Sequence, residues 1–208
     1  LQWNTSGSVI CDSYLRASPA SLMVDDHLLE VAADLVTRYD VDGLHLDHAR
    51  YAARASSCDP VSEAAYGAGC FDGDGQAYAD WQRQQVNATI AKFYAEIVPL
   101  KPDIWLSAAV WPIYMDVWGW GGTQGYHDYY QDSKAWLAAE TIDTIMPMIY
   151  GGSFWTQARF ETLVADFQAS NNGRYIIPGI GADFADFAEI DTRIGMARAA
   201  GTPGHAIF

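Results

Sequence analysis

Basic residues are scarce in this chain. Lys and Arg number 12 against 26 Asp and Glu, which gives a formal net charge of -14 over 208 residues. Nucleic acids and anionic membrane surfaces are bound through clustered Lys and Arg, so neither is an expected partner. Apolar runs are also short. None reaches the roughly 20 residues that a membrane-spanning helix needs, and we therefore expect no membrane insertion. An acidic surface of this kind suits a neutral or cationic substrate.

Cysteines are few as well: the chain has Cys11, Cys58 and Cys70. None of them has the spacing of zinc ligands, so we expect no metal centre. Cys58 and Cys70 flank a segment rich in Gly, Ala, Ser and Asp, where a disulfide would restrict the unfolded chain. The alternative is a pair of free thiols in a cytosolic protein. A disulfide would favour a secreted or cell-surface protein, with Cys11 free or paired outside this chain.

Two cofactor signatures are missing. No Gly-rich phosphate-binding turn follows the first expected strand, and Gly179-Ile180-Gly181 lacks the third glycine of such a turn. Residues 72–76 resemble a calcium-binding loop, but the Gly and Glu that this loop needs at its sixth and twelfth positions are absent. A flexible acidic turn is the simpler interpretation. We therefore expect no cofactor.

What the sequence does contain is an alternation of amphipathic helices and short apolar strands. Apolar residues at helical spacing, such as Leu28, Ala32 and Leu35 or Val86, Ile90 and Phe93, predict helices. Between these helices the apolar runs predict five strands, at residues 43–46, 104–110, 142–150, 175–180 and 205–208, with a sixth at 8–14 as an open alternative. Alternating strands and helices predict an α/β fold with a parallel sheet.

The long connections of this α/β pattern all follow strands, which is typical of a (β/α)8 TIM barrel. A doubly wound sheet is the alternative. A complete barrel usually needs about 250 residues, so we predict one partial barrel domain over residues 1–208. Its N-terminal strands and last helix would be missing, and a loop at about 52–78 would be inserted. The chain begins at Leu1 without a signal peptide, and we interpret it as a mature product or an ordered fragment.

The most informative segment is Val41 to Tyr51, a short strand that ends in ionisable side chains. Chemistry in α/β barrels lies at the carboxyl ends of the strands, so Asp47 is the first candidate for a catalytic carboxylate. The alternative for Asp47 is a structural salt bridge to Arg50. His45 lies two residues earlier and should share the face of Asp47, where it would bind substrate or tune Asp47, unless it is a satisfied core histidine. His48 and Arg50 would keep the carboxylate ionised or orient the substrate.

Several motifs in order carry a resemblance to a known family. The segment "DGLHLDHARY" resembles the "DGIHLDYIRYP" signature of glycoside-hydrolase-like family 10, long catalogued as a domain of unknown function. Further matching motifs follow at residues 80–87, 106–111, 129–137, 142–150 and 204–208. The resemblance implies a TIM barrel whose fourth to eighth strands are present here, and a usually secreted glycosidase that acts on a bacterial or plant polysaccharide. The chain departs from the family pattern at Met148, at Gly151 and in its long insertion.

Glycoside cleavage needs two carboxyl groups. Asp47 is one of them, and the α-amylase family carries its nucleophile on the corresponding strand in a similar pattern. The strand ending at Val110 has no acid, so the partner is sought in the loops. Asp183 follows the next-to-last strand and is the better placed; Asp116 is the second candidate, and both have the alternative of being ordinary solvated loop acids. The partner would otherwise lie in the missing strands.

Aromatic residues are abundant, with 8 Trp and 12 Tyr. Trp111, Tyr150 and Trp155 follow strands and are the candidates for stacking on sugar rings, whereas Trp81 and Trp136 lie on helices and should fill the core. The predicted function is hydrolysis of a polysaccharide or oligosaccharide, outside the cell or at its surface. Two alternatives remain, namely a carbohydrate-binding barrel without catalysis and a structural extracellular protein that reuses the fold.

Overall fold

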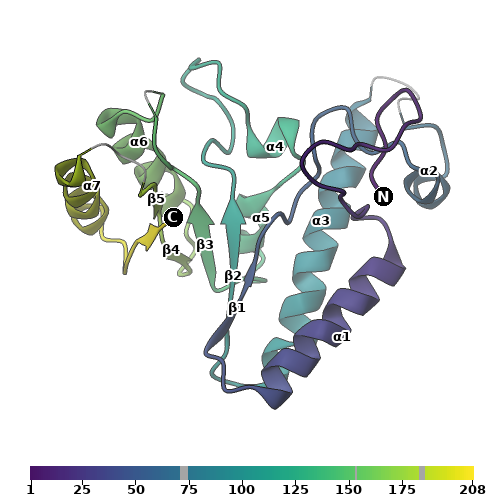
Figure 1. Ribbon diagram of the computed structural model, residues 1–208, viewed down its shortest axis with the longest axis horizontal. Coiled ribbons are helices and arrows are strands. Elements are labelled where there is room, and N and C mark those ends of the chain that lie inside the picture. The colour runs from purple at the N-terminus through teal and green to yellow at the C-terminus, as the bar shows by residue number, and fades with distance from the viewer. Residues whose placement is uncertain (71–74, 153, 183–185) are drawn as a thin grey trace.

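Figure 1 shows the computed structural model of the chain, which describes residues 1–70, 75–152, 154–182 and 186–208. It is a mixed α/β structure in which every strand pair of the sheets is parallel, as the sequence predicts. Four strands form one sheet in chain order, and two more form a second, two-stranded sheet. They are β1 (Gly43–Leu46), β2 (Trp105–Val110), β3 (Thr144–Pro147) and β4 (Tyr175–Ile176), then β5 (Gly179–Ile180) and β6 (Ala206–Ile207).

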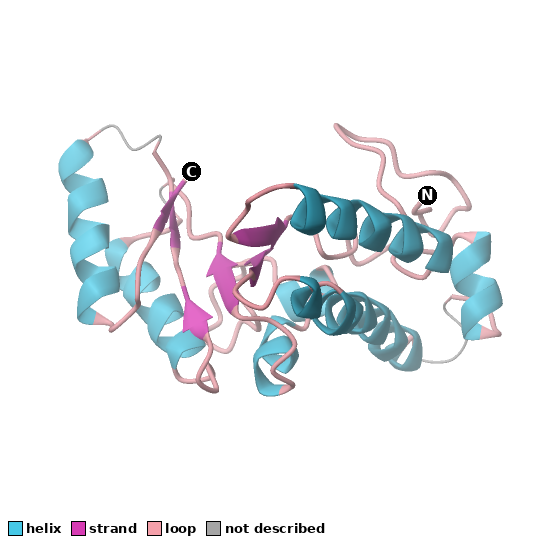
Figure 2. Ribbon diagram, turned by 90° about the horizontal axis from the view of Figure 1, so that it is seen from below, coloured by secondary structure: helices cyan, strands magenta, loops and turns pink. Residues whose placement is uncertain are grey.

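The helices flank this row of strands. In Figures 1 and 2, α1 and α3 lie on one side of the strands, and α6 and α7 lie on the other. The helices are α1 (Leu22–Arg38), α2 (Pro60–Tyr66), α3 (Gln76–Glu96), η1 (Val98–Leu100, a 3-10 turn), α4 (Gly125–Asp128), α5 (Ser133–Ala138), α6 (Gln157–Gln168) and α7 (Phe187–Ala199). The strands do not close into a barrel in the described part of the chain.

Prolines explain where the strands differ from the sequence prediction. The expected strand 175–180 is two short strands in different sheets, because Pro178 between them has no N–H to donate to a ladder. The third strand is shorter than the expected range 142–150 and ends at Pro147. Residues 8–14 form only isolated antiparallel bridges and add no strand to either sheet.

The insertion is more regular than the predicted loop at 52–78. It contains α2, which starts at Pro60 with Asp59 as N-cap, and α3 already begins at Gln76. The N-cap of α3 is Gly75 in the left-handed conformation. Asp80 lies one turn into α3, where it pairs with Arg83.

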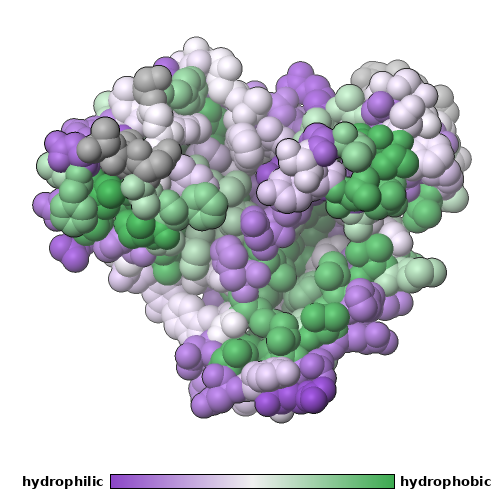
Figure 3. Space-filling model, viewed as in Figure 1, coloured by the Kyte–Doolittle hydropathy of each residue, from purple (hydrophilic) through white to green (hydrophobic). Residues whose placement is uncertain are grey.

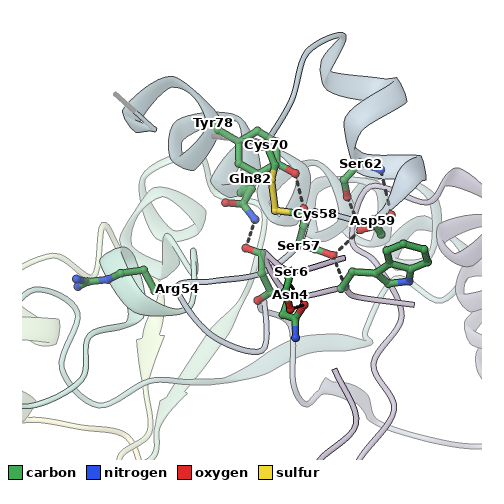
Figure 4. Close-up of a disulfide and its surroundings, with 12 residues drawn as sticks. Asn4, Ser6, Arg54, Ser57, Cys58, Asp59, Ser62, Cys70, Tyr78 and Gln82 are labelled. Carbon is green, nitrogen blue, oxygen red and sulfur yellow. Dashed lines mark hydrogen bonds between the residues drawn. A yellow bond between two sulfur atoms is a disulfide. The ribbon is translucent and has the colours of Figure 1, made fainter. Parts of the chain in front are cut away.

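The disulfide predicted from the sequence is confirmed. Cys58 and Cys70 are bonded, with an S–S distance of 2.04 Å, and Cys11 is free and exposed. Figure 4 shows the bond beside a buried polar cluster around Asp59. Tyr78 from α3 donates to the carbonyl oxygen of Ser57 in this cluster. The bond cross-links the insertion, and the hydrogen bond from Tyr78 fastens the insertion to α3. The described residues contain no group of metal-ligating side chains, and Asp72 and Asp74 lie outside them.

The two faces of the main sheet have opposite characters. Leu106, Ala108, Val110 and Ile145 are buried in the larger core, against residues of α1, α3 and α5. Because side chains alternate along a strand, the intervening positions face the other way. That inner face includes His45 of β1 and Ser107 of β2. The sheet thus holds its apolar core on the helix side and presents polar groups on the other.

The two helical tryptophans differ in their surroundings. Trp136 is buried in the larger core, as expected, and its indole N–H donates to Asn87 (2.6 Å). Trp81 is half-buried and packs on the small cluster formed by the disulfide and Tyr78. Both side chains therefore have structural partners.

Candidate active site

The ends of neighbouring strands bring the candidate residues together. The register of β1 and β2 places His45 opposite Ser107 and Leu46 opposite Ala108. Asp47 follows directly after β1, so it shares the face of His45. The segments that follow β1, β2 and β3 lie at the top of Figure 1. The site is thus built at the carboxyl edge of the sheet.

Asp47 is exposed at this edge. Its Oδ1 accepts a hydrogen bond from the backbone N–H of His48 (2.7 Å). The alternative of a structural salt bridge does not hold, because Asp47 and Arg50 form no ion pair within 4.0 Å. Asp47 therefore offers an open carboxylate to the solvent.

His45 is held by its neighbour on β2. Its Nδ1 lies 2.9 Å from Oγ of Ser107, and the Ser107 hydroxyl lies 3.2 Å from the carbonyl oxygen of Leu44. Burial lowers the pKa of His45 below its usual 6.5, and the negative charge of Asp47 opposes that shift. His45 is therefore neutral at neutral pH. Sequence reasoning missed Ser107, because the pairing of distant strands is not visible in a local motif.

Arg50 packs against a pair of aromatic rings that contact each other. Its guanidinium carbon is 5.2 Å from the ring centroid of Trp111 and 4.8 Å from that of Tyr129, and the two rings are themselves 4.2 Å apart. The Trp111 ring is fixed by its indole N–H, which donates to the carbonyl oxygen of Thr123 (2.7 Å). Tyr129 was not among the predicted site residues, although it lies in one of the matching motifs. Its ring completes a cation–π cluster beside Asp47.

His48 accepts from Arg50. The distance from Nη2 of Arg50 to Nε2 of His48 is 3.2 Å, and a guanidinium can only donate. Burial lowers the pKa of His48, and the nearby charges of Arg50 and Arg16 lower it further. His48 also has a positive φ of 59°, which turns the chain sharply after the strand. Arg50 has no carboxylate partner in the described part of the chain, so its charge is available to a ligand.

Tyr150 approaches the site from β3. Its ring stacks on Phe208 with centroids 4.5 Å apart, and a Cβ added at Gly179 would lie only 2.8 Å from its Cε1. Glycine at 179 therefore makes room for the tyrosine ring. Burial raises the pKa of Tyr150, and the negative charge of Asp47 raises it further.

Trp155 lies apart from the Asp47 group. It packs on Phe154 with ring centroids 4.7 Å apart and borders the smaller core with α6 and α7. Its carbonyl oxygen accepts from Arg193. No ring contact or hydrogen bond joins Trp155 to Asp47, His48 or Arg50 among the described residues.

Asp116 is occupied by its own loop. Its two carboxylate oxygens accept from the backbone N–H groups of Trp120 (3.0 Å) and Gly121 (2.7 Å), and its own N–H donates to Gln124. The hydrogen bond from Trp120, followed by the one from Gly121, holds the pKa of Asp116 below its usual 3.8, against the opposing effect of burial. A proton donor needs a carboxyl group that stays protonated. Asp183, the other candidate partner, lies outside the described residues.

A cleft of about 520 Å³ opens beside Asp47. The segment 45–50 forms one wall, the segment 14–19 forms another, and side chains of α1 and α3 close it, among them Leu28, Val86 and Phe93. Figure 3 shows this side of the molecule hollowed between the centre and the lower helix, with hydrophobic side chains around the hollow. The polar groups of the strand end thus border a largely apolar wall.

The sequence profile of the family described as Glycosyl hydrolase-like 10 matches residues 4–179. The chain belongs to this family. Glycosyl hydrolase DigH of Escherichia coli K12 is 30% identical over 151 residues, which covers 67% of this chain and 33% of that protein. Glycosyl hydrolase YngK of Bacillus subtilis strain 168 is 25% identical over 150 residues, or 66% and 28% of the two chains. The chain thus spans about a third of the length of these relatives.

Among solved structures, bee venom hyaluronidase matches with a TM-score of 0.43 and 12% identity, over 71% of this chain and 52% of that one. Within the described residues, no helix has both the length and the apolar character to cross a membrane. The matched residues include Asp47, which follows the first strand at its carboxyl end.

Proposed function

We propose that this chain is the catalytic-site portion of a glycoside hydrolase that cleaves a polysaccharide or oligosaccharide, with Asp47 as an essential carboxylate. The observation that carries the proposal is the exposed Asp47 at the carboxyl edge of a parallel sheet, next to Arg50 and two aromatic rings. Family membership supports the same reaction class. Sugar rings bind to such groups through hydrogen bonds and through C–H contacts with aromatic faces.

The six parallel strands support a barrel origin for the fold. Parallel strands with helices outside them, and chemistry at the carboxyl ends, are the pattern of a (β/α)8 barrel. We assign these strands to the fourth to eighth strands of such a barrel, with β4 and β5 together in the place of the seventh. The disulfide supports a secreted or cell-surface location, because disulfides persist in oxidising compartments.

The roles of the carboxyl groups follow from their surroundings. Asp47 already accepts a backbone hydrogen bond on Oδ1, so we assign it the nucleophile or base role rather than the proton donor. Asp183 is our proposed proton donor, because it follows β5 in the sequence and Asp116 is committed to its loop. Arg50, His48, Trp111 and Tyr150 would hold the sugar.

One observation favours a second candidate function. Among the described residues, the other carboxylate that lines the cleft is Asp25, which is already bound to Lys92 and Thr89, and hydrolysis needs two available carboxyl groups. A carbohydrate-binding protein without catalysis would keep the aromatic rings and Arg50 but would lack the acid pair. The two functions differ in whether any glycan is cleaved.

The test compares Asp47→Asn with Asp42→Asn in the full chain. Asp42 is also exposed and lies just before the same strand, so it is a matched control at the opposite edge of the sheet. Release of reducing ends from a panel of polysaccharides should be lost with Asp47→Asn and kept with Asp42→Asn, while glycan binding survives both changes. A wild-type chain that binds glycans and cleaves none would favour the binding function.

A further inference from the structure

Ser107 has no role in the function proposed above, yet it touches one of the site residues. Ser107 and His45 lie at the same level of β2 and β1, so their side chains emerge next to each other on the inner face of the sheet. The Ser107 hydroxyl has two neighbours, Nδ1 of His45 at 2.9 Å and the carbonyl oxygen of Leu44 at 3.2 Å. This arrangement decides where the ring of His45 carries its proton.

The position of the proton on the His45 ring depends on which neighbour receives the single hydroxyl hydrogen of Ser107. A serine hydroxyl has one hydrogen to donate, and a carbonyl oxygen can only accept. Both contacts are hydrogen bonds at once only if the Ser107 hydrogen goes to the carbonyl oxygen of Leu44 and Oγ of Ser107 accepts from an N–H at Nδ1 of His45. A neutral imidazole with its hydrogen on Nδ1 has a lone pair on Nε2. Ser107 thus fixes the tautomer of His45.

The lone pair on Nε2 is free to meet a ligand. Nε2 forms no hydrogen bond with any residue in the described ranges, and His45 is solvent-accessible and only partly desolvated where it lines the cleft with Asp47. Burial keeps the pKa of His45 below 6.5, and Asp47 is the charged group that acts against it. At neutral pH the cleft therefore presents two acceptors side by side, an imidazole nitrogen and a carboxylate. A ligand that satisfies both must carry several donors, as the hydroxyl groups of a sugar do.

We propose that Ser107 is a positioning residue that holds His45 with its hydrogen on Nδ1, so that Nε2 accepts a hydrogen bond from a hydroxyl group of the sugar bound at Asp47. The sugar in this inference rests on the proposed function. The tautomer does not, because it follows from contacts within the chain. The two parts can therefore be tested separately.

The tautomer is tested by the ring nitrogen shifts of His45 in the full chain, labelled with 15N-histidine. The chain has 5 His, and His45→Gln identifies the His45 signals by their loss. Wild type should show a protonated Nδ1 and an unprotonated Nε2 at neutral pH. Ser107→Ala should shift both nitrogens toward the averaged values of a free histidine, whereas Ser107→Thr, which keeps the hydroxyl, should restore the wild-type pattern. A protonated Nε2 in wild type, or no change in Ser107→Ala, overturns the inference.

The consequence for the sugar is tested by kinetics on whichever glycan the wild-type chain cleaves. Loss of one correctly oriented hydrogen bond should raise KM by about five- to tenfold in Ser107→Ala, with kcat nearly unchanged and with recovery in Ser107→Thr. An unchanged KM overturns the role in binding. If the wild type cleaves nothing but shows the expected nitrogen shifts, the proposed function fails while the positioning role stands, and glycan affinity by calorimetry then takes the place of KM.

Discussion

Two carboxylates of this chain, Asp47 and Asp59, have opposite surroundings. Asp59 is 2% exposed and accepts hydrogen bonds on Oδ2 from the hydroxyl groups of Ser18, Ser57 and Ser62 and on Oδ1 from the backbone N–H of Ser62. Asp47 is exposed and accepts one hydrogen bond from a neighbouring backbone N–H. Hydrogen bonds from the chain itself therefore occupy the carboxylate of Asp59, whereas the carboxylate of Asp47 is accessible to a ligand.

Burial and the number of hydrogen bonds therefore distinguish a structural carboxylate, Asp59, from a candidate functional one, Asp47. A buried carboxylate without hydrogen bonds would be costly, so the cluster in Figure 4 surrounds Asp59 with donors. That cluster ties three distant segments together, because Ser18, Asp59 and the Tyr78 contact to Ser57 come from different parts of the sequence. The hydrogen bond of Asp47, by contrast, is to the next residue and links no distant segments. Asp47 should therefore be dispensable for folding and indispensable for chemistry.

The largest effect that this comparison predicts is the loss of turnover in Asp47→Asn. We expect kcat/KM to fall at least about a thousandfold, or about 4 kcal/mol of transition-state stabilisation. The free energy of unfolding should change by no more than about 0.5 kcal/mol, because the site is exposed. Kinetics and urea denaturation on the same preparation measure both numbers. A variant that unfolds early and still turns over would reverse the assignment.

The next largest effect concerns the disulfide beside Asp59. Replacing Cys58 and Cys70 by Ser opens a loop of 12 residues, which should lower the free energy of unfolding by about 3 kcal/mol. Turnover by the remaining folded protein should be unchanged, since the bond lies in the insertion and Asp47 lies at the sheet edge. Cys11→Ser is the matched control and should alter neither quantity, because Cys11 is free and exposed.

A smaller loss of stability is expected for Asp59→Asn. The substitution removes Oδ2 as an acceptor for three hydroxyl groups and should cost about 2 kcal/mol. Burial raises the pKa of Asp59, but the hydrogen bonds from Ser57, Ser62 and Ser18 outweigh it and hold the pKa below its usual 3.8. The stabilisation is therefore complete above pH 3.8 and is lost as the pH falls through the lower, folded-state pKa. Urea midpoints of wild type and variant should differ at pH 6 and converge in stronger acid; a constant difference would contradict the charge argument.

Much of the fold was readable from local patterns in the sequence. The apolar run before Asp47 predicted β1, and helical spacing predicted α1 and α3, because these signals depend only on near neighbours. The strand ends were predicted less well, because the predicted strands 142–150 and 175–180 run across Pro147 and Pro178, where the observed strands stop or are interrupted. The helix α2 was missed although Asp59-Pro60 is an N-cap followed by proline at N1, a combination that typically starts a helix.

The candidate site was less accessible to sequence reasoning. The motif around Asp47 placed one carboxylate at a strand end, but the partners of its neighbours come from distant segments. Ser107 reaches His45 only through the register of two strands, and Tyr129 reaches Arg50 only through the packing of a loop after β2. Such contacts have no local period or spacing. Ser107 could have been predicted by aligning the expected strands in parallel register and looking for polar residues at paired positions.

The smallest effect concerns Asp116, whose surroundings lie between those of Asp47 and Asp59. It is half-exposed like a functional acid, but both of its oxygens accept backbone hydrogen bonds from the loop that carries Trp118 and Trp120. Those indoles stack with centroids 4.6 Å apart. The hydrogen bonds of the carboxylate therefore stabilise the conformation of a loop that carries two stacked aromatic rings. Asp116→Asn should therefore reduce kcat/KM by less than about tenfold and speed hydrogen exchange at the N–H groups of Trp120 and Gly121. A loss as large as that of Asp47→Asn, with exchange unchanged, would instead make Asp116 the missing proton donor and leave no such role for Asp183.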